Sequence, residues 1–168
     1  MTDPGLMETK HHGRSAFPLG VYLTDPFEYH DHAVNIHWHR EFQMIRIIKG
    51  TVMCCTGEKE FPLSESQGLF LNSGILHGFR ADQPALMQEL VFAPEMISES
   101  NSEIYDSYID PFLTQNISHL ILDSGDPTER TILDLISDIM GKNSSPHILC
   151  RLQIQIALLE LVSAAGSM

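Results

Sequence analysis

Eight short runs of β-forming residues fill the first 94 positions of this chain and limit its fold more than any other feature. Turn residues such as glycine, proline and aspartate separate neighbouring runs. Short strands at this spacing are typical of antiparallel sandwiches and barrels. The sequence therefore predicts a mainly β domain, with strands at residues 20–24, 34–39, 42–49, 51–56, 59–63, 68–71, 78–81 and 86–92.

After Pro94 the spacing of apolar residues changes from that of strands to that of helices. Apolar residues recur every three or four positions in residues 102–114, 126–141 and 147–162, which predicts three helices. In the second of these, Asp126 and Pro127 suit the first turn and Gly141 suits the end. We therefore expect three parts: a disordered N-terminal arm at 1–14, a β-barrel at 15–94 and a helical segment packed on the barrel at 95–168.

The last predicted helix is apolar on more than one face. One set of apolar residues includes Leu152, Ile156 and Leu159, and a second set includes Ile154 and Leu158. A helix of this kind usually buries one face in its own domain and the other against a partner. We expect a homodimer to which Leu152, Ile156 and Leu159 contribute; the alternative is a helix buried wholly within its own domain.

Three histidines can meet at one end of the predicted barrel. His37 and His39 are two positions apart, so they point to the same side of an extended segment. His77 follows beyond a hairpin and a further strand. The face that begins with His37 and His39 continues through Gln43 and then becomes aliphatic. This gradient suits a barrel interior with a wet mouth and a dry base.

The order of these residues resembles the cupin superfamily. Its first motif contains H-x-H, a glutamate four residues on and a glycine seven residues later, and its second is a glycine- and proline-containing turn that ends in a histidine. This chain departs from the motifs at three positions. Gln43 replaces the glutamate, Asn72 replaces the proline of the second motif, and Asp31 replaces the leading glycine of the first. The matching residues are His37, His39, Gly50, Gly74 and His77.

A wider stretch resembles the sensor cupin of AraC/XylS-type transcription regulators. The runs 68–77 and 102–113 are similar to that family, and residues 119–123 and two amphipathic helices follow in its usual order. The resemblance covers about residues 15–163. It implies a jelly-roll (double-stranded β-helix) barrel that binds a small-molecule effector, and helices that pair two copies. The family's helix-turn-helix normally comes next, so we expect an excised sensor domain or a naturally truncated regulator.

Three interpretations of the histidine triad remain open: a metal site, a polar effector pocket, or a closed core in which the imidazoles are hydrogen-bonded. Neutral imidazoles suit Zn²⁺, Ni²⁺ or another divalent transition metal. A cupin dioxygenase or isomerase usually adds a carboxylate, whereas Gln43 offers only a neutral amide. Glu41 could supply the charge only if a β-bulge changed the side to which it points.

We predict effector binding without catalysis and with no required cofactor. The alternative is a metal-dependent cupin enzyme that uses His37, His39 and His77. The remaining histidines at positions 11, 12, 30, 32, 119 and 147 are expected in solvent. The predicted ligand-binding residues are His37, His39, Gln43, Asn72, His77, Phe79 and Arg80.

Charge and composition exclude several classes of protein. Ten basic and 22 acidic residues give a net charge of −12, which argues against contact with a nucleic-acid backbone by this chain itself. No apolar run approaches the roughly 18 residues of a membrane span. A polar N-terminus that contains Asp3 and Glu8 is unlike a signal peptide, and three cysteines do not make a disulfide framework. We expect a cytoplasmic protein.

Overall fold

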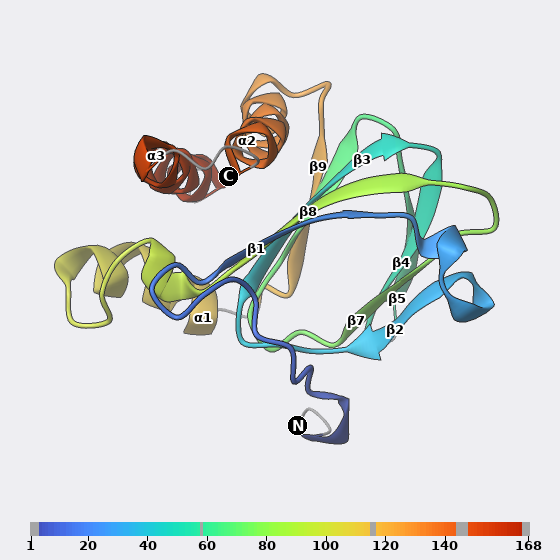
Figure 1. Ribbon diagram of the computed structural model, residues 1–168, viewed down its shortest axis with the longest axis horizontal. Helices are drawn as coiled ribbons and strands as arrows, with labels where there is room; N and C mark the ends of the chain where they lie inside the picture. The colour runs from blue at the N-terminus through green and yellow to red at the C-terminus, as the bar shows by residue number, and fades with distance from the viewer. Residues whose placement is uncertain (1–3, 58, 115–116, 144–147, 166–168) are drawn as a thin grey trace.

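Nine strands form two antiparallel sheets in the computed structural model, which describes residues 4–57, 59–114, 117–143 and 148–165 (Figure 1). One sheet has the strand order β1-β8-β3-β6-β9 and the other has the order β2-β7-β4-β5. The strands are β1 (Leu19–Thr24), β2 (Ala33–His37), β3 (Phe42–Lys49), β4 (Thr51–Thr56), β5 (Lys59–Ser64), β6 (Gln67–Leu71), β7 (His77–Arg80), β8 (Leu86–Phe92) and β9 (His119–Asp123).

All eight strands predicted before residue 94 are present, with ends that differ by at most two residues. The ninth strand, β9, comes from the segment predicted as helical and extends the five-stranded sheet beside β6. The predicted barrel boundary at residue 94 is corrected accordingly. The turn between β3 and β4 needs Gly50, whose φ of 77° lies in the left-handed region that other residues rarely adopt.

The strand β3 divides its side chains between two hydrophobic cores, as its alternation predicts. Ile45 and Ile47 point between the sheets, while Phe42 and Met44 point outward beneath the helices. A strand that is buried on both faces holds both layers in register. The core between the sheets consists of Ile45, Ile47, Val52, Cys54, Leu63, Leu69, Leu71, Phe79, Ala81, Ala85 and Met87.

Two helices, α2 (Pro127–Asn143) and α3 (Ile148–Ala165), cover the outer face of the five-stranded sheet (Figure 1). Asp126 accepts hydrogen bonds from the backbone N–H groups of Thr128 and Glu129, which caps α2 as the sequence predicts. Arg46 reaches from β3 to α2, where its guanidinium donates to the carbonyl of Leu133 at 2.8 Å. Helix α2 continues two residues past Gly141.

The helix predicted at 102–114 is present as a continuous helical run from residue 103 to residue 114, whose middle is π-helical. A π-helical turn, η5 (Tyr105–Ile109), precedes α1 (Asp110–Thr114). Single 3₁₀ turns complete the described elements: η1 (Pro4–Leu6), η2 (Pro26–Glu28), η3 (His30–His32) and η4 (Pro94–Met96). None of the helices in the described residues is long and apolar enough to cross a membrane.

The described part of the N-terminal arm, residues 4–14, is not the disordered segment that the sequence predicts. The backbone N–H of Glu8 donates to the carbonyl of Trp38 at 2.8 Å, and the N–H of Trp38 donates to the carbonyl of Leu6 at 3.0 Å. Met7 and Trp38 thereby form a parallel β-bridge. His12 is buried farther along the arm. These contacts join segments about 30 positions apart, so the polar composition of the arm does not reveal them.

Candidate functional site

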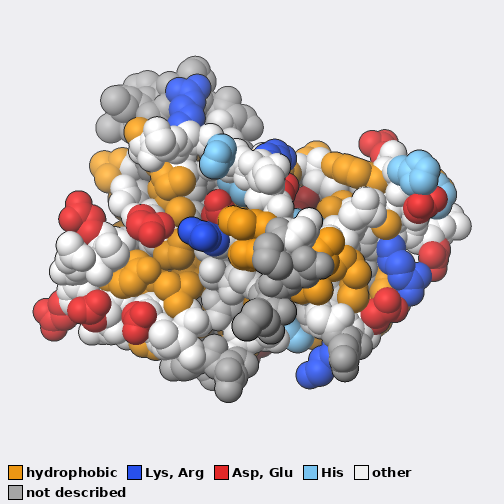
Figure 2. Space-filling view, turned by 90° about the horizontal axis from the view of Figure 1, so that it is seen from below, with side chains coloured by type: hydrophobic (Ala, Val, Ile, Leu, Met, Phe, Trp, Pro, Cys, Tyr) orange, Lys and Arg blue, Asp and Glu red, His pale blue; other side chains and the backbone are white. Residues whose placement is uncertain are grey.

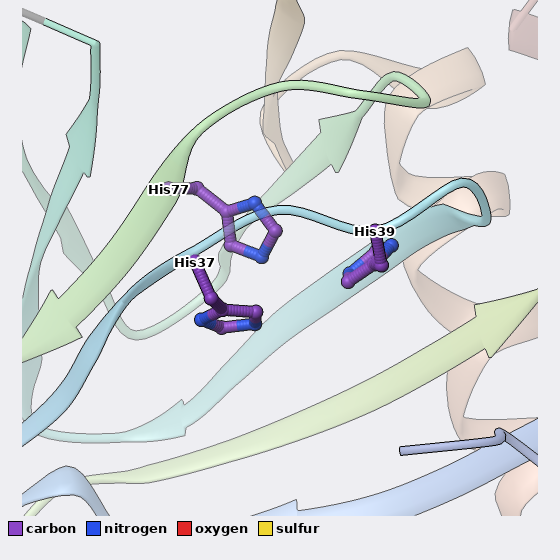
Figure 3. A group of neighbouring side chains, drawn as sticks. All are labelled: His37, His39 and His77. Carbon is purple, nitrogen blue, oxygen red and sulfur yellow. The ribbon is translucent and has the colours of Figure 1, made fainter. Parts of the chain in front are cut away.

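The three predicted histidines converge at the mouth of the barrel (Figure 3). His37 ends β2, His39 follows in the loop, and His77 begins β7. Because β2 and β7 are paired with His37 opposite His77, these two rings lie 4.4 Å apart between centroids. The N–H of Gly74 donates to the carbonyl of His39 at 2.8 Å and ties the two loops together. One ring nitrogen from each histidine lies within 4.8 Å of the others.

Backbone carbonyls determine which nitrogen of each imidazole carries the hydrogen. Nδ1 of His37 lies 2.8 Å from the carbonyl of Asn35, and Nδ1 of His77 lies 2.8 Å from that of Ile75. Nδ1 of His39 lies 3.2 Å from the carbonyl of Glu41. A carbonyl only accepts, so each Nδ1 donates, and in the neutral ring Nε2 keeps its lone pair. In neutral rings the Nε2 atoms of His37 and His77 are therefore acceptors, whereas the role of Nε2 of His39 depends on which way the Gln43 amide is turned.

Burial keeps two of these rings neutral. The pKa of His77 is lowered to about 3 by burial, with smaller contributions from His37 and His39. The pKa of His39 is also lowered, mainly by burial, although the hydrogen bond with Gln43 opposes this shift. In the described residues Nε2 of His77 is buried without a hydrogen-bond partner, and so is Oγ1 of Thr56, which is paired with His77 across β4 and β7. Unpartnered buried atoms of this kind point to a polar ligand or an ion.

Gln43 links the triad to a carboxyl group that the sequence analysis missed. Its Oε1 lies 3.1 Å from Nε2 of His39, and its Nε2 donates to Oε2 of Glu89 at 2.7 Å. Burial raises the pKa of Glu89, opposed by hydrogen bonds from Thr24 and Gln43. If the Gln43 amide is turned over, it donates to His39 and accepts from a protonated Glu89 instead. The two arrangements differ in the position of one proton, which is on Nε2 of His39 in the first and on Glu89 in the second.

A cavity of about 200 Å³ lies beside the triad. This volume corresponds to about six or seven water molecules. Strands β1, β2, β3 and β8 form its walls, and the N-terminal arm forms its cover. The lining residues are Glu8, Lys10, His12, Tyr22, Thr24, Tyr29, Val34, His37, His39, Gln43, Glu89 and Val91.

The arm contributes charged groups to this cavity. Oε2 of Glu8 accepts from Nε2 of His12 at 3.0 Å and lies 3.7 Å from Nε2 of His37. Nδ1 of His12 in turn accepts from the hydroxyl of Tyr22 at 2.9 Å. Lys10 places its ammonium group 4.0 Å from the centre of the Tyr22 ring. His12 was predicted in solvent, but only 7% of it is exposed because the arm folds back over the barrel.

Four of the seven predicted ligand residues do not line the cavity: His77, which belongs to the triad beside it, and Asn72, Phe79 and Arg80. Asn72 donates to the carbonyls of Phe112 and Ile117 and so fastens the chain around α1. Phe79 fills the core between the sheets, where its ring meets that of His77. Arg80 is exposed and pairs with Glu60 at 3.2 Å. His37, His39, Gln43 and His77 come together as predicted.

The alternation of side chains along a strand could have excluded Arg80 from the pocket and identified Glu89 as an inward-pointing residue. Arg80 is three positions from His77, an odd number, so in a strand it points to the opposite side. Glu89 is two positions from Met87, a core residue, so it points into the barrel. By contrast, no local pattern places Glu8 or His12 beside β1 and β2.

The donor set fits a divalent transition-metal ion. Three imidazoles whose ring nitrogens lie within 4.8 Å of one another are ordinary ligands of Zn²⁺ or Ni²⁺, and the buried Nε2 of His77, which has no partner among the described residues, fits such an ion or a polar ligand. Backbone carbonyls fix the orientation of each ring through its Nδ1. This is the outer-shell arrangement that metal-binding histidines commonly have.

The fold is thus a two-sheet barrel with a polar cavity at its mouth. Residues 26–162 match the AraC-like ligand binding domain family, and the chain belongs to this family. The resemblance to AraC-type sensor domains predicted from the sequence is thereby confirmed.

Known proteins give the following similarities. An uncharacterized HTH-type transcriptional regulator of Bacillus subtilis, YdeC, is 27% identical over 138 residues, which make up 82% of this chain and 47% of the regulator. This chain therefore spans about half the length of that relative. An RmlC-like cupin from Shewanella frigidimarina is 15% identical over 44% of this chain and 65% of its own, with a TM-score of 0.40. Oxalate decarboxylase of Bacillus subtilis, which has Mn(II) centres, is 19% identical over 36% of this chain and 18% of its own, with a TM-score of 0.33.

Proposed function

We propose that this chain is the effector-sensing domain of a transcription regulator and binds a small polar molecule without transforming it. The observation that carries the proposal is the cavity beside the triad, which offers donors and acceptors from rigid strands and is covered by the arm. Convergent polar groups in a preformed hollow are the usual means of recognising a small molecule. We also propose that the protein is located in the cytoplasm.

The chemistry of the cavity favours binding over catalysis. Gln43 is uncharged where a cupin enzyme of the dioxygenase or isomerase type has a carboxylate, and it faces His39 and Glu89. The Glu89 carboxyl group also lines the cavity, but it is held by hydrogen bonds from Gln43 and Thr24. Metal-dependent turnover by His37, His39 and His77 would overturn this part of the proposal.

The strands that line the cavity also contact the helices. Gln43 points into the cavity from β3, and Arg46 of the same strand donates to α2. Glu89 points inward from β8, and the neighbouring Gln88 accepts a hydrogen bond from Ser137 of α2 at 2.7 Å. A ligand that displaces β3 or β8 therefore displaces α2. It can shift the balance of two states only by its difference in affinity for them.

The exposed face of α3 is the proposed surface for a second copy of the chain. Ile154 and Leu158 are buried against the domain, whereas Leu152, Ile156 and Leu159 are 58%, 48% and 38% exposed. They recur at helical spacing, which is the pattern of a helix that pairs with a partner. Pairing through α3 would transmit movement of α2 across a dimer.

This chain itself is not proposed to contact nucleic acid. Its net charge is −12, and phosphate backbones are bound through clustered Lys and Arg. Figure 2 shows acidic side chains gathered around apolar ones at the left end of the displayed face, the end where α1 lies in Figure 1. A surface of this kind repels phosphate.

A cavity-filling variant tests effector binding. Monosaccharides, amino acids and aromatic acids are screened for an increase in melting temperature, and any hit is measured by calorimetry. Val91→Phe fills the cavity from β8, whereas Ile121→Phe adds the same ring on the 44% exposed side chain of β9. We expect a hit to bind wild type and Ile121→Phe but not Val91→Phe. Equal binding to Val91→Phe would contradict the assignment of the cavity.

Light scattering tests the dimer. Ile156→Asp is expected to give a monomer, because it places a charge in the apolar face of α3. Leu23→Asp makes the same kind of change at a leucine that is 60% exposed on β1, away from α3, and is expected to leave the oligomeric state unchanged. A wild-type monomer would refute pairing through α3.

A further inference from the structure

We infer that Glu8 of the N-terminal arm completes a divalent transition-metal site on His37, His39 and His77, so that the ion fastens the arm to the barrel. The inference concerns the cavity described above but does not depend on the identity or existence of an effector. It rests on the position of one carboxylate relative to three imidazoles.

Glu8 places a carboxylate beside one of the three imidazoles, that of His37. Its Oε2 is 3.7 Å from Nε2 of His37, the nitrogen that the Asn35 carbonyl leaves without a hydrogen. Glu41 lies 3.7 Å from Nδ1 of His39, the nitrogen that already donates to the backbone. Glu89 is held by Gln43. Among these carboxylates, only Glu8 lies next to an Nε2 acceptor.

A buried cation needs a negative ligand at this place. His39 and His77 are 4% and 1% exposed, and moving a divalent ion into such surroundings with neutral ligands alone is unfavourable. Gln43 supplies no charge, so the position at which cupin enzymes usually carry a carboxylate is neutral here. The Glu8 carboxylate reduces the net charge of the complex from +2 to +1.

Neighbouring side chains hold Glu8 ready for this role. His12 donates from Nε2 to Oε2 of Glu8, and the hydroxyl of Tyr22 donates to Nδ1 of His12. A relay of this kind orients a carboxylate before the ion arrives, as outer-shell partners of metal ligands do. The Glu8 side chain is 25% exposed, which leaves the ion a path from solvent.

The three imidazoles are close enough to share an ion, and the Glu8 carboxylate, which is near His37 only, would have to move toward the other two rings. In a tetrahedral site with ligand bonds of about 2.1 Å, neighbouring donor atoms are about 3.4 Å apart. The donor nitrogens of the triad are already within 4.8 Å of one another, and the Glu8 oxygen is 3.7 Å from His37. Rotations of the imidazoles about their side-chain bonds would bring the donors together. Imidazole with carboxylate suits Zn²⁺ and Ni²⁺.

The ion would add a second attachment to an arm that is fastened to β2 through the hydrogen bonds between Leu6, Trp38 and Glu8. Trp38 is the single tryptophan of the chain, so its emission reports on docking of the arm. Its backbone pairs with the residues on both sides of Met7. Metal binding should therefore slow hydrogen exchange of the Glu8 and Trp38 amides.

Calorimetry with Zn²⁺ and Ni²⁺ alone, on chelator-stripped full-length chain, tests the inference. The variants are Glu8→Gln, which removes the charge but keeps the shape, and Glu41→Gln as the matched control. We expect one ion per wild-type chain, an affinity lower by about tenfold or more in Glu8→Gln, and a change within about threefold in Glu41→Gln. Zinc should change Trp38 emission and slow exchange of the arm amides in wild type and Glu41→Gln only.

Three results would overturn the inference: no zinc or nickel bound by wild type, equal affinity in Glu8→Gln, or arm amides whose exchange does not respond to the ion. Each is separable from failure of the sensing role. An effector that stabilises the metal-stripped protein would support sensing even if no metal binds. Tight, Glu8-dependent zinc binding would support this inference even if the Val91→Phe experiment failed.

Discussion

Replacement of His77 by asparagine should make the metal-free protein much less sensitive to mild acid. Asparagine can place its amide nitrogen near the position of Nδ1 and keep the hydrogen bond to the Ile75 carbonyl. The substitution removes the His77 imidazole, which stays neutral in the folded state. The variant therefore measures the effect of protonating His77 on stability, with the hydrogen bond to the backbone kept.

The size of the effect follows from the pKa of His77, which burial lowers from 6.5 to about 3. As the pH falls below 6.5, the unfolded chain binds a proton at this position while the folded chain remains neutral, so folding is disfavoured. Each unit of pH removes about 1.4 kcal/mol until the folded ring also titrates. Between pH 6.5 and pH 5 the loss is about 2 kcal/mol, and it approaches about 5 kcal/mol near pH 3.

Urea unfolding in the presence of EDTA at pH 7 and pH 5 measures the effect as a difference between proteins. Wild type should lose about 2 kcal/mol more than His77→Asn between these two pH values. His30→Asn, at a side chain that is 93% exposed, is the control for loss of one histidine. If wild type and His77→Asn lose the same stability on acidification, then His77 is not held neutral by burial and the reasoning is wrong.

Three further predictions follow from packing, anchoring and burial. Gly68→Ala should lower the stability by about 1–3 kcal/mol in thermal melts, because the new Cβ would lie 2.3 Å from the carbonyl oxygen of Ile45. Gly141→Ala should raise the stability by about 0.5–1 kcal/mol, because nothing lies within 4 Å of the new Cβ and alanine is more stable than glycine within a helix. Arg46→Gln should lower the stability by roughly 1–2 kcal/mol in urea unfolding by removing bonds to α2, and an unchanged midpoint would contradict that anchoring role. Cys54 should resist iodoacetamide at pH 8 in mapped alkylation, because burial raises the pKa of its thiol to about 12; rapid modification of the folded protein would show that burial to be wrong.

Local patterns correctly predicted the strands and the part of the site formed by His37, His39, His77 and Gln43. Alternation along β3 correctly assigned Gln43 to the barrel interior, because side-chain direction in a strand depends only on the number of positions between residues. The cap at Asp126 and the turn at Gly50 were equally local. The same rule contradicts the assignment of Arg80 to the pocket.

Non-local pairing accounts for the rest. The strand β9 reads as part of a helical region, and only its pairing with β6 makes it part of the barrel. Asn72 resembled a pocket residue because of its motif position, yet its amide binds carbonyls about 40 residues away. Contacts across such separations depend on how whole elements pack, and no short window of sequence contains that information.

By itself, the sequence determined a β-barrel followed by helices, a cluster of His37, His39 and His77, and an apolar face on α3 that exceeds what its own domain covers. These properties follow from periodicity, which is a property of neighbouring residues. Only the tertiary structure decided that the cluster is flanked by Glu8 and backed by Glu89. The reason is physical: the arm and β8 reach the triad through pairing with distant strands, so the charges around the histidines are set by topology rather than by spacing along the chain.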